Sequence, residues 1–267
     1  MKTTTSMGAK SRRIIELAQQ ANTITLSDPT RINRLKYLGQ KVDEMLGFVY
    51  GYTQINDPKI AGDDEIINWT FVDVSDDINA AAWNLCSGFY KSAATLLRNA
   101  LDIATVSLYF QAREDFTKNG DEKYFSEWEC GKRDTPNWRE MKTLINKLQP
   151  IKDFNIQDSC DIVNEIYSHF QYLCNFTHSR PYSNDDDLPT NSINMGADTP
   201  DFDEQLFERI CELTEDTIGW ICTIWLVIYP KILKTNPLGD TATMDQYEKL
   251  LNVQRGMDAL KYADKLI

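Results

Sequence analysis

The sequence predicts an all-α protein, a helical bundle with a long central helix and peripheral N-terminal helices. Apolar residues recur at helical spacing in several long segments, cap residues and prolines mark helix starts, and no segment has the alternation of a confident strand. With 267 residues, 42% of them hydrophobic, the chain is long enough to bury a sizeable core. We expect residues 1–64 to form an N-terminal helical arm and residues 65–267 a bundle domain, together one compact unit.

The arm is expected to contain two helices. Residues 10–20 predict a short helix with apolar side chains on one face. Ser27-Asp-Pro-Thr30 is a helix-start signal, since Pro suits the first turn and the residues beside it cap it. Apolar residues recur from there to about Tyr50, and the Gly-, Asn- and Pro-rich residues 51–64 predict a loop.

The clearest element of the bundle follows Gly88, which is expected to kink the chain or join two helices. Before it, residues 66–74 are ambiguous between helix and strand, and Ser75-Asp-Asp77 predicts the cap of a helix. After it, a long apolar stripe of period 3.6 predicts a central helix that packs on several sides. The stripe consists of Phe89, Ala93, Leu96, Leu97, Ala100, Leu101, Ala104 and Leu108.

Further helices are predicted in the second half of the chain. Asp134-Thr-Pro136 is another helix-start signal, and residues 162–173 carry an apolar stripe. Residues 180–200 are rich in Asn, Asp, Pro and Ser and predict a loop. Two amphipathic helices are expected over residues 202–233 and 244–265.

Composition restricts the class of protein. A net charge of −12 and a pI near 4.7 do not favour nucleic acid at long range, although RNA stays possible through a local basic patch. The six cysteines contain no C-x-x-C pair and are expected to be reduced thiols. The chain starts without an apolar signal segment, and its most apolar window is shorter than the about 20 residues that span a bilayer. We expect a soluble cytoplasmic protein without membrane contact.

Motifs exclude several chemistries. The sequence contains neither G-x-G-x-x-G nor G-x-x-x-x-G-K-[ST], the glycine-rich loops that bind nucleotide phosphates. It also lacks H-E-x-x-H and G-x-S-x-G. With two histidines and no paired cysteines, neither a metal site nor a cofactor is expected.

Arg98 and Asp102 are four residues apart and therefore share one face of the predicted central helix. One interpretation is a structural salt bridge within or between helices. The other is that Arg98 faces a cleft and holds an anion such as a phosphate, because its planar guanidinium grips phosphate oxygens at two points.

His178 stands near the end of a predicted helix, because Pro181 disfavours helical geometry at Arg180. A histidine in this place can cap the last carbonyl groups of the helix. It can also act as a general acid or base, since imidazole titrates near neutral pH. His169 lies in the middle of the same helix and is expected to be structural.

Two segments carry a family resemblance. The string Ala93-x-x-Leu-Leu-Arg-Asn-Ala-Leu-Asp102 resembles the A-x-x-L-L-R-x-x-L-E helix of bacterial helical domains related to the HEPN superfamily. Residues 167–180 are similar to the later Y-x-x-L-x-x-x-x-H stretch of these domains, and the resemblance covers about residues 76–230. The positions in that second stretch are Tyr172, Asn175, His178 and Arg180. The resemblance implies a bundle of four to five helices, usually dimeric, of the kind linked to abortive infection and other antiviral systems.

The resemblance also implies a chemistry. In active HEPN members two R-x4–6-H motifs meet across the dimer in a metal-independent ribonuclease site, where His moves a proton and Arg steadies the phosphate charge. Here the positions of that Arg, residues 171–173, hold Gln, Tyr and Leu. Arg98 or Arg180 would have to replace it.

The leading interpretation is therefore a cytoplasmic HEPN-like protein that acts by protein binding or regulation. It would work as a homodimer or with a protein partner, in an antiviral defence or toxin–antitoxin system. The alternative is a divergent metal-independent ribonuclease that uses His178. In this alternative Asp102, Tyr172 and Asn175 are supporting residues of the site. A third hypothesis is a structural or regulatory helical protein without any role toward nucleic acid, which the acidic pI favours slightly.

Overall fold

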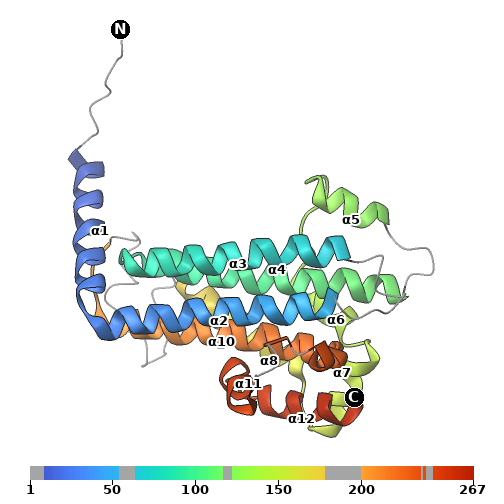
Figure 1. Cartoon of the computed structure of the whole chain (residues 1–267). Helices are drawn as coiled ribbons and strands as arrows, with labels where there is room; N and C mark the ends of the chain where they lie inside the picture. The colour runs from blue at the N-terminus through green and yellow to red at the C-terminus, as the bar shows by residue number, and fades with distance from the viewer. Residues whose placement is uncertain (1–8, 54–63, 117–121, 178–199, 236, 239–242) are drawn as a thin grey trace.

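The computed structural model describes residues 9–53, 64–116, 122–177, 200–235, 237–238 and 243–267. Within these ranges the ordered elements are helices, and no strand is present (Figure 1). The all-α prediction is therefore confirmed. The same ranges contain no helix that is long and apolar enough to cross a membrane.

Helices α1 (Ala9–Ser27) and α2 (Pro29–Thr53) meet at a sharp corner (Figure 1). The corner forms where the sequence predicts a helix start: Pro29 opens α2, and the carboxylate of Asp28 accepts the backbone N–H of Thr30 at 2.7 Å. The predicted end of the first helix at residue 20 is wrong, because the helix continues to the corner. The loop predicted from residue 51 is also wrong in part, since α2 runs to Thr53; residues 54–63 lie outside the described residues.

Helices α3 (Asp64–Cys86) and α4 (Tyr90–Phe116) pack along each other. The ambiguous segment 66–74 is helical. The cap predicted at Ser75 is wrong: its hydroxyl donates to the Val72 carbonyl at 2.9 Å, so that it is satisfied inside the helix and does not start one. Gly88 joins the two helices as expected, with φ +76°.

Four helices follow along the chain: α5 (Glu122–Glu129), α6 (Trp138–Ile145), α7 (Gln149–Gln157) and α8 (Ile162–Thr177). The helix start predicted at residues 134–136 is wrong by a few residues. The cap of α6 is Asn137, whose side-chain oxygen accepts the backbone N–H of Glu140 at 3.1 Å. Asn caps a helix as well as Asp does, and Asn137 lies three residues closer than Asp134 to the apolar face that α6 buries.

The C-terminal part contains α10 (Glu204–Ile228), the 3₁₀ helix η1 (Pro230–Thr235), α11 (Met244–Leu250) and α12 (Gly256–Leu266). The helix predicted over residues 202–233 ends at Ile228, because Pro230 lacks the N–H that α-helix continuation needs. The helix predicted over 244–265 is two helices. The buried Lys41 ammonium of α2 donates to the Lys249 carbonyl and so caps the last turn of α11.

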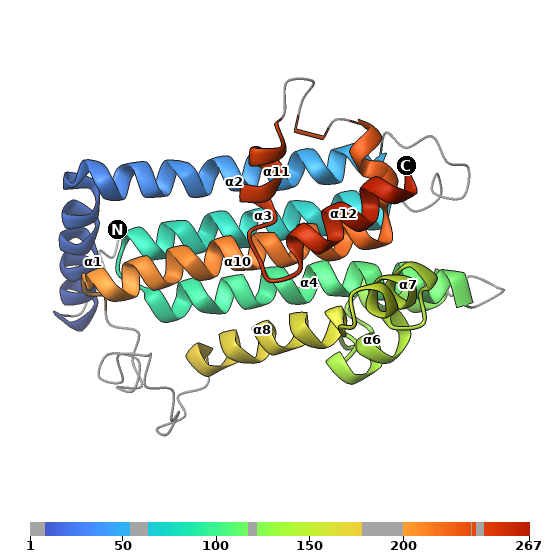
Figure 2. The same cartoon turned by 90° about the horizontal axis from the view of Figure 1, so that it is seen from below.

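The long helices form one bundle. Helix α4 packs against α3, α8, α10 and α6, while α2 packs against α3 and α10. Figure 2 shows α2, α4 and α10 starting at the end of the bundle where α1 lies, with α3 and α8 running the other way. Apolar side chains of α2, α3, α4, α8 and α10 fill a continuous core, among them Leu38, Met45, Val74, Ala81, Leu97, Leu101, Ile166, Leu173, Ile210 and Trp225.

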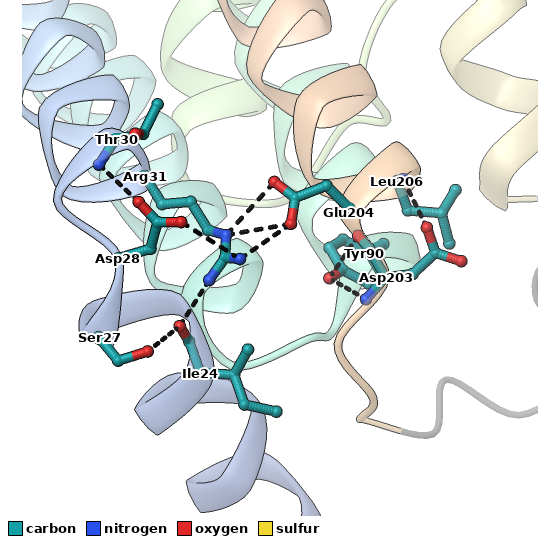
Figure 3. Close-up of polar contacts among 9 residues, drawn as sticks. All are labelled: Ile24, Ser27, Asp28, Thr30, Arg31, Tyr90, Asp203, Glu204 and Leu206. Carbon is teal, nitrogen blue, oxygen red and sulfur yellow. Dashed lines mark hydrogen bonds and ion pairs between the residues drawn. The ribbon is translucent and has the colours of Figure 1, made fainter.

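Polar contacts hold the helix starts together at this end (Figure 3). The guanidinium of Arg31 binds both carboxylate oxygens of Glu204, the Ile24 carbonyl and the Asp28 carboxylate. The hydroxyl of Tyr90 accepts the N–H of Asp203 at 3.0 Å. The starts of α2, α4 and α10 are therefore fixed relative to the α1–α2 corner.

Candidate functional site

Arg98 and Asp102 lie on one face of α4, as their spacing predicts. The guanidinium carbon of Arg98 lies 5.2 Å from the centre of the Phe170 ring on α8, a cation–π contact. The Nε atom of Arg98 is buried and has no hydrogen-bond partner among the described residues. One polar atom of Arg98 is therefore left without the partner that a buried donor needs.

Asp102 is partly buried beside Arg98. Burial raises the pKa of the Asp102 carboxyl, and the Arg98 charge and the Trp138 indole lower it in part. No ion pair within 4 Å joins Arg98 to Asp102, so the close salt bridge that the sequence left open is not formed. The pair interacts through its charges across a short distance.

An aromatic cluster on α6 and α8 covers this face of α4. Trp138 lies 4.7 Å from Phe170 and 5.3 Å from Tyr167, measured between ring centres. The ammonium of Lys142 lies 4.5 Å from the centre of the Tyr167 ring and donates to Asn164 at 2.6 Å. From the sequence, Trp138 is expected only to anchor its segment, and neither Trp138 nor Lys142 is expected beside Arg98, because their α6 positions alone do not show which helix they meet.

Tyr172 is turned to a different neighbour, α10. Its hydroxyl accepts a hydrogen bond from Arg209 at 2.7 Å, and its ring lies 5.2 Å from the Arg209 guanidinium carbon. Arg209 also pairs with Glu212 at 2.9 Å. Tyr172 therefore contacts α10 while Arg98 contacts α8, and no hydrogen bond or ion pair among the described residues joins the two into one site.

His169 and Asp216 add two titratable groups to the α8–α10 contact. The His169 ring lies 3.0 Å from the Thr217 hydroxyl, and burial, with a smaller effect of the Arg209 charge, lowers the pKa of His169 to about 4. Burial raises the pKa of Asp216 to about 6, against the attraction of Arg209. His169 is thus neutral at pH 7 and partly buried, which agrees with the structural role expected for it.

The other predicted residues fall at or beyond the end of α8. Asn175 is half-buried in the last turns of the helix. His178 and Arg180 lie outside the described residues, so their catalytic roles stay predictions. Arg98 and Asp102 of α4 lie on the side of α8 that carries Phe170, whereas Tyr172 of α8 contacts α10.

This arrangement is suited to holding helices together. Arg98 is stacked on an aromatic ring, Tyr172 is bonded to Arg209, and His169 is neutral in an interior contact. The residues that the structure describes contain no group of three or more His, Cys, Asp or Glu side chains placed to hold a metal ion. Arg98 retains one chemical capacity, since its buried Nε–H can donate to an anion.

Comparison with family models, with curated proteins and with solved structures finds no significant match for this chain.

Proposed function

We propose that this protein is a cytoplasmic HEPN-like helical protein that acts by binding a protein, and that the partner is a second copy of this chain. The observation that carries the proposal is helix α1, which extends from the bundle (Figure 1) and exposes four of its large apolar side chains. Ile14 and Ile15 are 44% and 43% exposed, and Ile24 and Leu26 are exposed to a similar extent. Most of the stability of a helix in a protein comes from packing of its apolar face, so the exposed apolar side chains of α1 favour a further packing surface.

Charge complementarity favours self-association. Helix α1 carries Arg12 and Arg13 beside its exposed isoleucines, in a chain whose net charge is −12. The outer face of α3 carries Asp76 together with Trp83, which is 70% exposed. A basic, apolar helix and an acidic, apolar helix face on the same chain complement each other between two copies.

Light scattering after size exclusion tests the proposal over a range of protein concentrations. We expect the parent protein to be a dimer and Ile14→Asp/Ile15→Asp to be a monomer with unchanged helix content. The matched control is Ile156→Asp, which places the same charge on the 79% exposed Ile156 of α7 and should stay dimeric. Arg13→Glu should weaken the dimer, and adding Asp76→Arg should restore it. A parent protein that is monomeric at every concentration contradicts the proposal and leaves a different protein as the partner to be sought.

The setting in antiviral defence or in a toxin–antitoxin pair is part of this proposal and is supported by the sequence resemblance alone. Self-association is compatible with it, because the related domains are usually dimeric. Expression of the gene with and without phage challenge tests the setting independently of the dimer. A strain that is equally sensitive with and without the protein contradicts it.

One observation favours a second candidate, the divergent ribonuclease. Arg98 of α4 has a buried Nε–H without a partner among the described residues. Its guanidinium stacks on Phe170 of α8, the helix that ends at Thr177, immediately before His178 in the chain. An unpaired guanidinium N–H is a suitable donor to a phosphate oxygen. RNA cleavage in excess chelator by the parent, and its loss in a folded His178→Ala variant, would support this candidate; equal cleavage by both, or none by either, would contradict it.

A further inference from the structure

A cavity of about 510 Å³ lies between the later part of α4 and the first turns of α6. Figure 2 shows the two helices side by side there. It is lined by Tyr109 and Arg113 from α4 and by Asn137, Arg139, Glu140, Thr143 and Leu144 from α6. Its volume is that of a small-molecule site, and none of the site residues predicted from the sequence lines it.

Arg113 is held in a fixed orientation at one wall. Its Nη1 donates to the Tyr109 hydroxyl at 3.2 Å, and its guanidinium carbon lies 4.1 Å from the centre of the Tyr124 ring. The guanidinium carbon of Arg133 lies 4.0 Å from the same ring. A guanidinium that is already oriented loses less side-chain entropy when it binds an anion.

Arg139 supplies a second guanidinium from the opposite wall. It is exposed and has no ion-pair partner among the described residues. The lining contains two arginines and one glutamate, Glu140, so its formal charge is +1 in a chain of net charge −12. Two arginine forks from two helices are the donors that recognise phosphate in two-point fashion.

The rest of the lining suits an organic group beside the anion. The Tyr109 ring and the Leu144 side chain are apolar surfaces. The Asn137 oxygen accepts the Glu140 N–H, so the Asn137 amide nitrogen can still donate to a ligand. The cavity also borders the first turn of α6, where the helix dipole favours negative charge.

We propose that this cavity binds a phosphorylated small molecule of about mononucleotide size, with Arg113 and Arg139 gripping the phosphate. The activity goes beyond the protein binding proposed above and uses different residues. It places a small-molecule site on a protein whose sequence carries no phosphate-binding loop.

Isothermal titration calorimetry tests the site with the four ribonucleoside 5′-monophosphates, each beside its unphosphorylated nucleoside. We expect at least one monophosphate to bind and to bind more tightly than its nucleoside. Arg139→Gln, an exposed position that leaves the fold intact, should weaken that binding by about tenfold or more, the loss expected for a charge-assisted hydrogen bond. Lys152→Gln on α7 removes the same charge from an exposed position outside the cavity and is the matched control, expected to bind as the parent does.

Glu140→Gln should change the affinity for the monophosphate in the opposite direction to Arg139→Gln. Because the Glu140 carboxylate repels an anion in the cavity, its removal should tighten binding by about two- to fivefold. The proposal is overturned if no monophosphate binds better than its nucleoside. It is equally overturned if Arg139→Gln and Lys152→Gln have the same affinity, or if Glu140→Gln weakens binding.

Discussion

The Nε2 atom of His169 on α8 lies 3.0 Å from the hydroxyl oxygen of Thr217 on α10. The Thr217 hydroxyl donates its one hydrogen to the Leu213 carbonyl at 2.7 Å, so it can only accept from His169. Nε2 therefore carries a hydrogen. Because burial lowers the pKa of His169 to about 4, the ring is neutral at pH 7 and its Nδ1 carries no hydrogen. A titratable side chain joins the two helices in a buried contact, and this contact has a pH dependence.

Replacing His169 by Gln should remove an acid-induced loss of stability. The pKa of His169 is lowered from 6.5 to about 4, so between these values the unfolded chain takes up a proton that the folded chain does not. The contribution of His169 to the free energy of unfolding should be fully present at pH 7. The free energy of unfolding of the parent should then fall by roughly 3 kcal/mol as the pH decreases through this window. His169→Gln keeps a donor for Thr217 without titrating. Urea unfolding at pH 7, 5.5 and 4 measures the difference, and parallel pH profiles of parent and variant would contradict the assignment.

Asp216→Asn should raise the stability at neutral pH, whereas His169→Gln changes the stability at acidic pH. Burial raises the pKa of Asp216 from 3.8 to about 6, so its contribution to stability is complete below 3.8 and is lost as the pH rises through 6. The variant should gain about 1 kcal/mol at pH 7, a value that allows for solvent screening of a partly exposed group, and nothing at pH 4. Glu212→Gln, on an exposed and ion-paired neighbour, is the control and should give no gain. A gain for Asp216→Asn that is equal at both pH values would show that charge is not its cause.

Arg31 and Glu204 should be energetically coupled although 173 residues separate them. The Arg31 guanidinium binds both Glu204 oxygens, donates to the Ile24 carbonyl and lies 4.5 Å from the Phe202 ring centre. Arg31→Ala should cost about 2 kcal/mol, of which a double-mutant cycle with Glu204→Gln should assign about 0.5–1 kcal/mol to the exposed ion pair. Lys249→Ala, which removes an exposed pair within α11, is the control and is expected to leave the stability nearly unchanged. Additive effects of Arg31→Ala and Glu204→Gln would contradict the coupling.

The helices were predictable from the sequence wherever apolar residues keep helical spacing over a long segment and the residue at the boundary has only one structural role. Pro29 and Gly88 are of this kind, and the structure begins α2 and joins α3 to α4 there. Ser75 has two structural roles open to it, because its hydroxyl can cap a helix or bond to the preceding turn. Its neighbours Phe71, Val74 and Ile78 are buried in the core, so the helix continues through Ser75 and the hydroxyl bonds to the preceding turn. Tertiary contact also decides the break after Leu250, since the capping Lys41 is about two hundred residues away.

The candidate site was predictable only within one helix. The spacing of Arg98 and Asp102 placed both on one face of α4, because helix geometry alone fixes that relationship. The contact between Tyr172 and Arg209 depends on how α8 and α10 pack, which no local pattern contains. The cavity between α4 and α6 depends in the same way on Arg113 and Arg139 meeting from separate helices.

Three glycine-to-alanine changes should separate backbone strain from steric conflict. Gly39 lies in α2 with no atom within 4 Å of an added Cβ, so Gly39→Ala should stabilise by about 0.5–1 kcal/mol through helix propensity. Gly131 has φ +66° in open space, and Gly131→Ala should cost about 1 kcal/mol from the left-handed backbone alone. At Gly88, φ is +76° and an added Cβ would lie 2.4 Å from the Asp201 carbonyl oxygen, so Gly88→Ala should cost about 3 kcal/mol or more. Urea unfolding of the three variants measures the order, and a Gly88→Ala protein as stable as Gly131→Ala would mean that the segment before α10 does not pack on the α3–α4 turn.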